Sequence, residues 1–206
     1  MPHAPVTLSL IAITSVVSWL AWNKPGWLDR LILWPPAITR GRQYWRFLSY
    51  GFIHADAQHL LFNMITLYFF GRAMEPLFAH YIGDAGYVLF YAGGLLVSIL
   101  PSYLAKRDNP GYRSLGASGA VSAVLFAFIL LQPWALLYVF FIPAPAIVFA
   151  VLYVGYSVWA ERQSRDNVNH SAHLWGAAYG ILFMLIMEPR VLAVFWQQLT
   201  NPGWAG

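Results

Sequence analysis

The chain has 206 residues, of which 59% are hydrophobic and only 10% charged, against about a quarter charged in ordinary soluble domains. The apolar residues gather in runs long enough to cross a lipid core of about 30 Å, which excludes a soluble enzyme, a coiled coil and a disordered binder. The formal net charge of +4 comes from scattered lysines and arginines, which suit loops and lipid headgroups and do not form a nucleic-acid-binding surface.

Hydropathy predicts six membrane spans within one membrane domain that covers residues 1–206. We expect the spans at about 6–22, 58–78, 87–104, 117–131, 136–159 and 171–187. Residues 23–56 form a long first connection that is rich in basic and aromatic residues, and we expect it to lie in the membrane interface. The expected fold class is therefore an all-α polytopic membrane bundle.

The fourth span is short for a membrane helix. Fifteen residues make only about 22 Å of helix, so the helix is expected to begin below the membrane surface. The preceding stretch contains Asn109, Pro110 and Gly111 and cannot be helical throughout. Irregular backbone at that depth persists only where protein buries it or where it lines a wet cavity. The sequence thus predicts a water-filled hollow where residues 116–119 begin a helix.

Few ionisable residues are expected at membrane depth, where they are costly and usually functional. The carboxylates all lie in connections or at span ends: Asp29, Asp56, Glu75, Asp84, Asp108, Glu161, Asp166 and Glu188. Cysteine is absent, which excludes disulfides, thiolate catalysis and cysteine-built metal sites. A buried general base, if the protein has one, must therefore be a histidine.

Ser118 and His173 are candidates for a nucleophile and its base. Ser118 lies at a helix start among small residues, where free backbone N–H groups can bind an oxyanion. His173 shares a helix face with Gly176 and Gly180, which would hold the imidazole against a neighbouring helix. The alternative is that these small residues serve close helix packing only, with an interfacial histidine above them.

His59 and Asn63 lie four residues apart on the second span, and both can donate hydrogen bonds to an oxyanion. His54 precedes them near the entrance of this span. A metal site built from His54, His59 and His173 is a second interpretation, although neither an acidic ligand nor an HExxH spacing supports it.

Four patterns occur together along the chain, and with them it resembles the rhomboid family of intramembrane serine proteases. The patterns are Trp45-Arg46, His54-x4-His59-x3-Asn63, Gly116-x-Ser118-Gly119 and Ala172-His173-x-x-Gly176-x-x-x-Gly180. GxSG alone would be a weak signal, but its combination with the two histidine patterns on separate spans is highly specific. The resemblance covers essentially the whole length from Val6 to about Arg190.

The resemblance implies that Ser118 is the nucleophile and His173 its general base. His59, Asn63 and the Ser118 backbone N–H would form the oxyanion hole, without metal or cofactor. The expected supporting residues are His54, Gly116, Gly119, Gly176, Gly180, Trp45 and Arg46, and Glu75 matches a structural glutamate of the family.

The family acts within the lipid bilayer on single-span membrane proteins, and the fifth span, interrupted by Pro143 and Pro145, resembles the mobile helix proposed to gate substrate entry. The small size is typical of a bacterial inner-membrane protein, and we expect that location. The family topology places ten of the twelve basic residues outside, whereas the positive-inside rule favours the reverse. We follow the family topology because the first connection is expected to lie in the interface.

Two other functions are compatible with a chain of this kind. A catalytically silent rhomboid-like protein would bind or escort membrane clients, but such members usually lose the serine or the histidine, and this chain keeps both. A transporter or channel is disfavoured because the spans carry neither paired charges nor an internal repeat.

Overall fold

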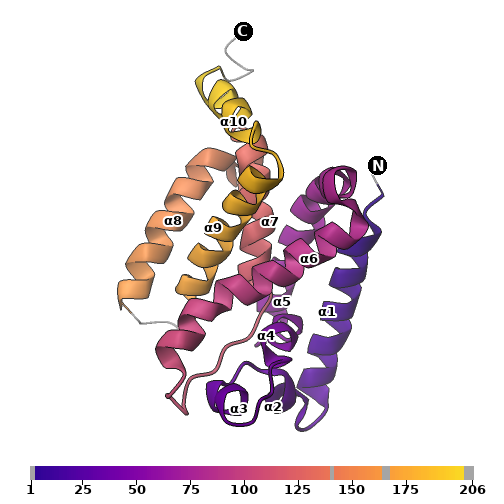
Figure 1. The fold of residues 1–206 in the computed structure, drawn as a ribbon, viewed down its shortest axis with the longest axis vertical. Helices are drawn as coiled ribbons and strands as arrows, with labels where there is room; N and C mark the ends of the chain where they lie inside the picture. The colour runs from indigo at the N-terminus through magenta and orange to yellow at the C-terminus, as the bar shows by residue number, and fades with distance from the viewer. Residues whose placement is uncertain (1–2, 140–141, 164–167, 202–206) are drawn as a thin grey trace.

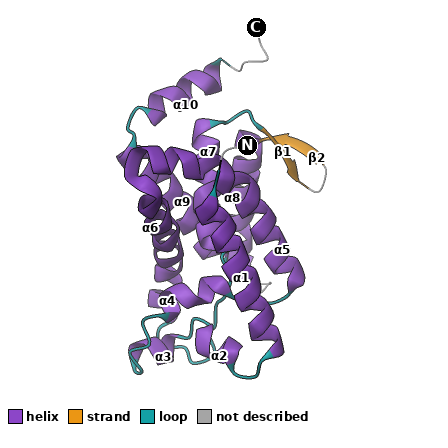
Figure 2. Cartoon of the chain, turned by 90° about the vertical axis from the view of Figure 1, so that its right-hand side faces the viewer, coloured by secondary structure: helices purple, strands orange, loops and turns teal. Residues whose placement is uncertain are grey.

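The computed structural model describes residues 3–139, 142–163 and 168–201, and these form a bundle of helices with one short hairpin (Figures 1 and 2). The helices are α1 (Pro5–Asn23), α2 (Trp27–Leu31), α3 (Pro35–Thr39), α4 (Arg46–Ser49), α5 (Ala57–Thr66), α6 (Arg72–Lys106), α7 (Ser118–Leu131), α8 (Ala146–Gln163), α9 (His170–Met187) and α10 (Val191–Thr200). A 3-10 turn (Tyr50–Phe52) precedes α5, and a π-helical segment (Leu67–Gly71) joins α5 to α6. Parts of the expected 1–206 domain at 1–2, 140–141, 164–167 and 202–206 lie outside the described residues.

Within the described residues, three helical segments are long and apolar enough to cross a membrane: Pro5–Asn23, Ala57–Lys106 and His170–Met187. The middle segment contains the second and third expected spans, and its backbone breaks at Gly83, where φ is +74° and ψ is 169°. A residue with a side chain rarely adopts this conformation, so glycine allows the two spans to follow each other almost without a loop. The first and sixth expected spans fall on α1 and α9.

The fifth expected span differs from the structure in its first part, where two short strands precede the helix. There β1 (Leu136–Val139) pairs antiparallel with β2 (Ile142–Pro145), and α8 begins only at Ala146 (Figure 2). Pro143 and Pro145 lack the N–H groups that a helix interior requires, and both fit an edge strand. They therefore lie ahead of α8 and do not weaken it, which corrects the expectation of a proline-interrupted fifth span.

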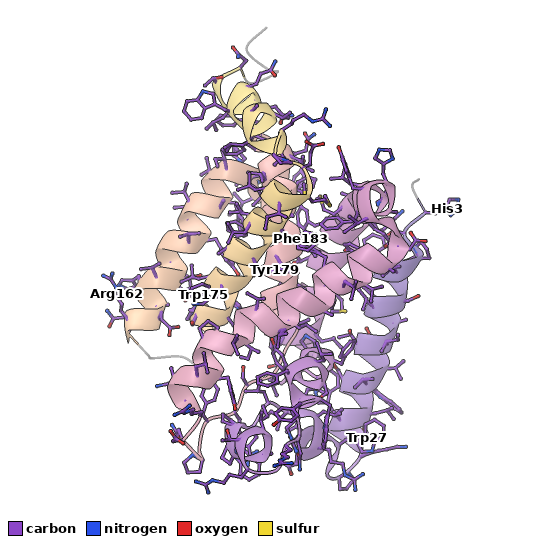
Figure 3. All side chains as sticks on the ribbon, in the orientation of Figure 1. His3, Trp27, Arg162, Trp175, Tyr179 and Phe183 are labelled. Atoms are coloured by element: carbon purple, nitrogen blue, oxygen red, sulfur yellow. The ribbon has the colours of Figure 1, made fainter. Side chains whose placement is uncertain are left out.

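Helix α7 lies at the centre of the bundle, against both α6 and α9 (Figure 1). Its 14 residues span about 21 Å, and from Gly119 to Ala127 every residue is buried. On the α6 side of α9, the rings of Tyr179 and Phe183 pack against Phe90 with ring centroids 5.5 and 5.0 Å apart (Figure 3). The apolar core is thus continuous through three helices.

Glycines bring the backbones of α7 and α9 into direct contact. A Cβ added to Gly176 would lie 2.1 Å from the carbonyl oxygen of Gly119, and one added to Gly180 would lie 2.1 Å from that of Ala123. Both distances are far inside van der Waals contact with backbone atoms, which cannot rotate away. The two glycines therefore fix how closely the helices approach.

Two buried charges anchor the periphery of the bundle. Arg46 donates from Nη1 to the carbonyl oxygens of Asp29 and Ile32, at 2.8 and 2.6 Å, and thereby closes the first connection, while its neighbour Trp45 stays exposed. Glu75 on α6 accepts from the backbone N–H groups of Val6 and Thr7, at 2.9 and 2.6 Å. This carboxylate caps α1, because the first N–H groups of a helix have no acceptor within it.

The glycine contact generates a stability prediction. Gly180→Ala inserts a methyl group against the α7 backbone, so we expect a destabilisation of about 1–3 kcal/mol and a lower thermal unfolding midpoint in detergent. Gly155→Ala on α8 is the matched control, because its added Cβ meets nothing within 4 Å and alanine has a higher helix propensity than glycine. Equal midpoints for the two variants would contradict the role assigned to this contact.

Candidate active site

Helix α7 begins inside the bundle and not at its end. The connection after α6 climbs from the end of the molecule that carries α2 and α3 to the middle of the bundle, where Ser118 opens α7 (Figure 1). Three backbone hydrogen bonds fix this connection: Leu33 and Ser114 exchange two, at 3.0 and 3.1 Å, and the Gly116 N–H donates to the Tyr50 carbonyl at 2.9 Å. Ser118 is therefore held at a defined depth.

Ser118 and His173 are in hydrogen-bond contact. The distance between Ser118 Oγ and His173 Nε2 is 2.8 Å, and both side chains are half-buried, so the pair is accessible yet largely surrounded by protein. His173 lies one turn before Gly176 on α9, and Ser118 directly precedes Gly119 on α7. The backbone contact between the two helices thus sets the spacing of the pair. An imidazole nitrogen at this distance can take the serine proton, which is the geometry of an activated nucleophile.

The start of α9 is fixed by a polar cap. The side-chain oxygen of Asn169 accepts from the Ala172 N–H at 3.0 Å and from the Ser102 hydroxyl at 3.1 Å. Its amide group donates to the Tyr112 hydroxyl at 2.9 Å. Because these partners come from α6 and from the connection before α7, the cap ties the first turn of α9, which carries His173, to the segment that leads to Ser118.

Tyr153 on α8 is a residue of the site that the sequence did not indicate. Its ring stacks on the imidazole of His173 with centroids 6.0 Å apart and an interplanar angle of 23°. Its hydroxyl lies 2.7 Å from Ser122 Oγ, one turn beyond Ser118 on α7. Tyr153 therefore restricts the plane of the imidazole. The sequence carries no signal that links Tyr153 to this pair, because it is one tyrosine within an apolar run.

His59 lies against the turn before Ser118. Gly116 has φ +111°, and a Cβ at this position would lie 2.6 Å from His59 Cε1 and 2.9 Å from Nε2. Both the backbone angle and the space therefore require glycine. One turn further along α5, Asn63 is buried and donates from Nδ2 to the His59 carbonyl at 2.9 Å, which leaves its second amide hydrogen for another acceptor.

His54 is fully buried, and its two ring nitrogens face protein groups. Nε2 accepts from the Ala117 N–H at 3.2 Å, and Nδ1 lies 3.1 Å from Ser18 Oγ. The three-histidine metal site that the sequence left open does not form: in the described part of the chain, no three histidine, cysteine or acidic residues are placed to hold a metal ion.

Comparison with known proteins gives a consistent family match. A family model described as Rhomboid domain matches residues 41–190. "RHOMBOID-like protein 12, mitochondrial" of Arabidopsis thaliana is 31% identical over 174 residues, which cover 79% of this chain and 52% of that protein. "Putative rhomboid protease YdcA" of Bacillus subtilis is 24% identical over 203 residues, 88% of each chain.

"Rhomboid protein 1, mitochondrial" of Saccharomyces cerevisiae is 33% identical over 139 residues, which cover 65% of this chain and 39% of that protein. The chain therefore spans about half of the Arabidopsis protein, less of the yeast protein and most of the Bacillus protein.

The stacked tyrosine generates a prediction about the reactivity of Ser118. Tyr153→Phe keeps the ring on His173 and should label with a fluorophosphonate probe at nearly the wild-type rate. Tyr153→Ala removes the ring, and we expect about tenfold slower labelling because the imidazole loses its fixed orientation. Mass spectrometry of the labelled peptide measures both rates, and equal rates for the two variants would show that the stacking has no effect on Ser118.

Proposed function

The chain belongs to the rhomboid family, and from this premise we propose that it is an intramembrane serine endopeptidase that cleaves transmembrane segments with Ser118 and His173. Family membership and the long apolar helices identify an integral membrane protein with a rhomboid-type helical bundle. The observation that carries the proposal is the 2.8 Å contact between Ser118 Oγ and His173 Nε2 at the start of a helix inside that bundle.

In the proposed reaction, His173 removes the proton from Ser118 Oγ as this oxygen attacks the carbonyl carbon of the scissile peptide bond. The resulting oxyanion would be stabilised by the Ser118 backbone N–H, His59 and Asn63. Collapse of this intermediate breaks the C–N bond, and His173 gives its proton to the departing amine. A water molecule, deprotonated by His173, then hydrolyses the acyl-enzyme and restores Ser118.

The proposed substrates are membrane proteins, single-span proteins in particular, whose cleaved segment leaves its helical form at the site. An α-helix engages its carbonyl groups in hydrogen bonds to the residue four positions ahead, so a serine cannot reach them in an intact helix. Small residues on both sides of Ser118 leave room for an extended segment at the nucleophile. The substrate must therefore unfold locally before it is cut.

The proposal also concerns the membrane in which the protein acts. The expected location in a bacterial inner membrane stays a prediction, because the relatives include mitochondrial proteins as well as one from Bacillus subtilis. The lipid bilayer itself is the common element of these locations, and the proposed chemistry is the same in each.

Removal of either member of the pair should abolish cleavage. We expect Ser118→Ala and His173→Ala to leave a tagged single-span reporter uncut on co-expression, whereas wild type yields a product band on an immunoblot. Ser157→Ala and His80→Ala are the matched controls, because one alters another buried serine and the other a histidine outside the site. A product that persists in Ser118→Ala would refute the proposal. Folded wild-type protein that neither cuts reporters nor labels at Ser118 would favour the silent, client-binding function.

The oxyanion donors generate a quantitative prediction. Asn63→Ala should lower kcat by about 10²–10³-fold at most, the usual loss for a single donor to an oxyanion. Thr66→Ala is the control, because Thr66 makes the same kind of side-chain bond to a carbonyl four residues earlier on α5. Initial rates on a reporter peptide in detergent compare the two. A loss shared by both variants would mean that Asn63 acts only through the stability of α5.

A further inference from the structure

A buried chain of hydrogen bonds joins α1 to the turn before Ser118. Ser18 on α1 donates from Oγ to the Phe52 carbonyl at 3.1 Å and lies 3.1 Å from His54 Nδ1. On the other side of the ring, His54 Nε2 accepts from the Ala117 N–H at 3.2 Å. Both Ser18 and His54 have no exposed surface, so water does not compete for these bonds.

The donor and the acceptor of each hydrogen bond between Ser18, His54 and Ala117 follow from the groups involved. A backbone N–H can only donate, so Nε2 of His54 carries a lone pair, and in this neutral ring the proton lies on Nδ1. The pKa of His54 is lowered to about 3, chiefly by burial and also by the neighbouring His59, while Asp56 opposes the shift, so the neutral form prevails near pH 7. Ser18 Oγ then accepts from Nδ1 and uses its own hydrogen for Phe52.

These bonds hold the peptide groups that lead to the nucleophile. The Gly116 N–H is bound by the Tyr50 carbonyl and the Ala117 N–H by His54, so both are engaged before the chain reaches Ser118. The next N–H, that of Ser118, belongs to the first turn of α7, whose donors have no acceptor within the helix. The orientation of Ala117 therefore determines where the Ser118 N–H and Oγ point.

His54 also supports His59. The two rings meet edge to face with centroids 4.8 Å apart, and His59 in turn lies against Gly116. A rotation or a change of tautomer at His54 would therefore disturb both the Ala117 peptide and the His59 ring. The backbone of His54 is held separately, because Trp22 Nε1 donates to the His54 carbonyl at 2.7 Å. Loss of the Ser18 hydroxyl should thus free the imidazole ring of His54 to rotate, while the backbone of His54 stays bound to Trp22.

We propose that Ser18 is a positioning residue of the active site, which holds His54 in its Nδ1–H tautomer so that His54 fixes the Ala117 peptide and aims Ser118. Ser18 contacts neither the substrate nor the reacting atoms, and it acts through His54 alone. The inference rests on the proposed protease function, because aim matters only if Ser118 is a nucleophile. It gives α1 a role in catalysis, although the sequence motifs of the site all lie outside this helix.

Thr14 provides a matched control on the same helix. It lies one turn before Ser18, is likewise fully buried, and its hydroxyl has no hydrogen-bond partner within the described part of the chain. Thr14→Val and Ser18→Ala both remove a buried hydroxyl from α1, but only the second removes a bond to His54. A general effect of α1 on stability would appear in both variants.

The test compares three variants with wild type in detergent. We expect Ser18→Ala to lower kcat about tenfold, the effect of one lost hydrogen bond, with KM within about twofold. Fluorophosphonate labelling of Ser118 should slow in parallel, and ¹⁵N NMR of labelled histidine should show His54 leaving the pure Nδ1–H tautomer. Thr14→Val should match wild type in all three measurements, and Ser18→Thr, which restores the hydroxyl, should recover most of the lost rate.

Other results would refute either the positioning role of Ser18 or the proposed protease function, and the two can be told apart. Equal kcat in Ser18→Ala and Thr14→Val, or an unchanged His54 tautomer in Ser18→Ala, would overturn the positioning role even if the wild type is an active protease. A wild type that neither cleaves nor labels at Ser118 would instead overturn the proposed function. Thermal unfolding midpoints of all variants separate both results from misfolding, since a loss of kcat at an unchanged midpoint cannot come from unfolding.

Discussion

The contact between the backbones of α7 and α9 is the constraint on which the rest of the site depends. A methyl group at Gly176 or Gly180 would overlap carbonyl oxygens of α7, so the two helices approach more closely than any residue with a side chain at these positions would allow. His173 lies one turn from Gly176, and Ser118 adjoins Gly119. The packing of the two helices therefore fixes the backbone positions from which Ser118 Oγ and His173 Nε2 reach each other. The small residues therefore pack the two helices closely, and this packing is also what positions Ser118 and His173.

The elements around this contact are held by buried polar groups whose partners come from distant parts of the chain. Arg46 closes the first connection on carbonyl groups, Glu75 caps α1, and Asn169 caps α9. A buried polar group destabilises a protein unless its hydrogen bonds are satisfied, so each of these residues fixes one particular arrangement of its neighbours. Ser18 and His54 are held in the same way, and through the Ala117 N–H they fix the turn before Ser118. A rigid frame of this kind suits a reaction that needs two side chains held in register.

The sequence predicted the helical membrane bundle because apolar runs and their ends are local features. Helices α7 and α9 begin within one residue of the expected boundaries at 117 and 171, where small residues and the Asn169 cap mark their starts. Residues 136–145 were expected to be part of a span, because hydropathy does not distinguish an apolar hairpin from an apolar helix.

The candidate site was predicted only in part. The patterns around Ser118 and His173 made their pairing foreseeable, and the structure places them in contact. Tyr153 and Ser18 had no such signal, since each is a single residue in an apolar run and its hydrogen-bond partner, Ser122 or His54, lies more than 30 positions away. Only the packing of α8 and α1 on the bundle reveals them.

The same structure bears on the unusual distribution of positive charge. The basic residues concentrate in the sequence segments that follow α1, α6 and α8, and Figure 3 shows Trp27 near the lower end of the molecule and His3 higher up, beside the start of α1. Several of them are engaged with the protein: Arg46 is buried on carbonyl groups, Arg113 lies over the ring of Trp34 at 4.9 Å, and Lys24 over that of Trp27 at 5.8 Å. The positive-inside rule counts charges in loops that must stay with the cytoplasmic surface, and charges bound within a folded interfacial segment contribute less to such a count. The charge bias is therefore a weaker argument against the family topology than the number of arginines and lysines alone indicates.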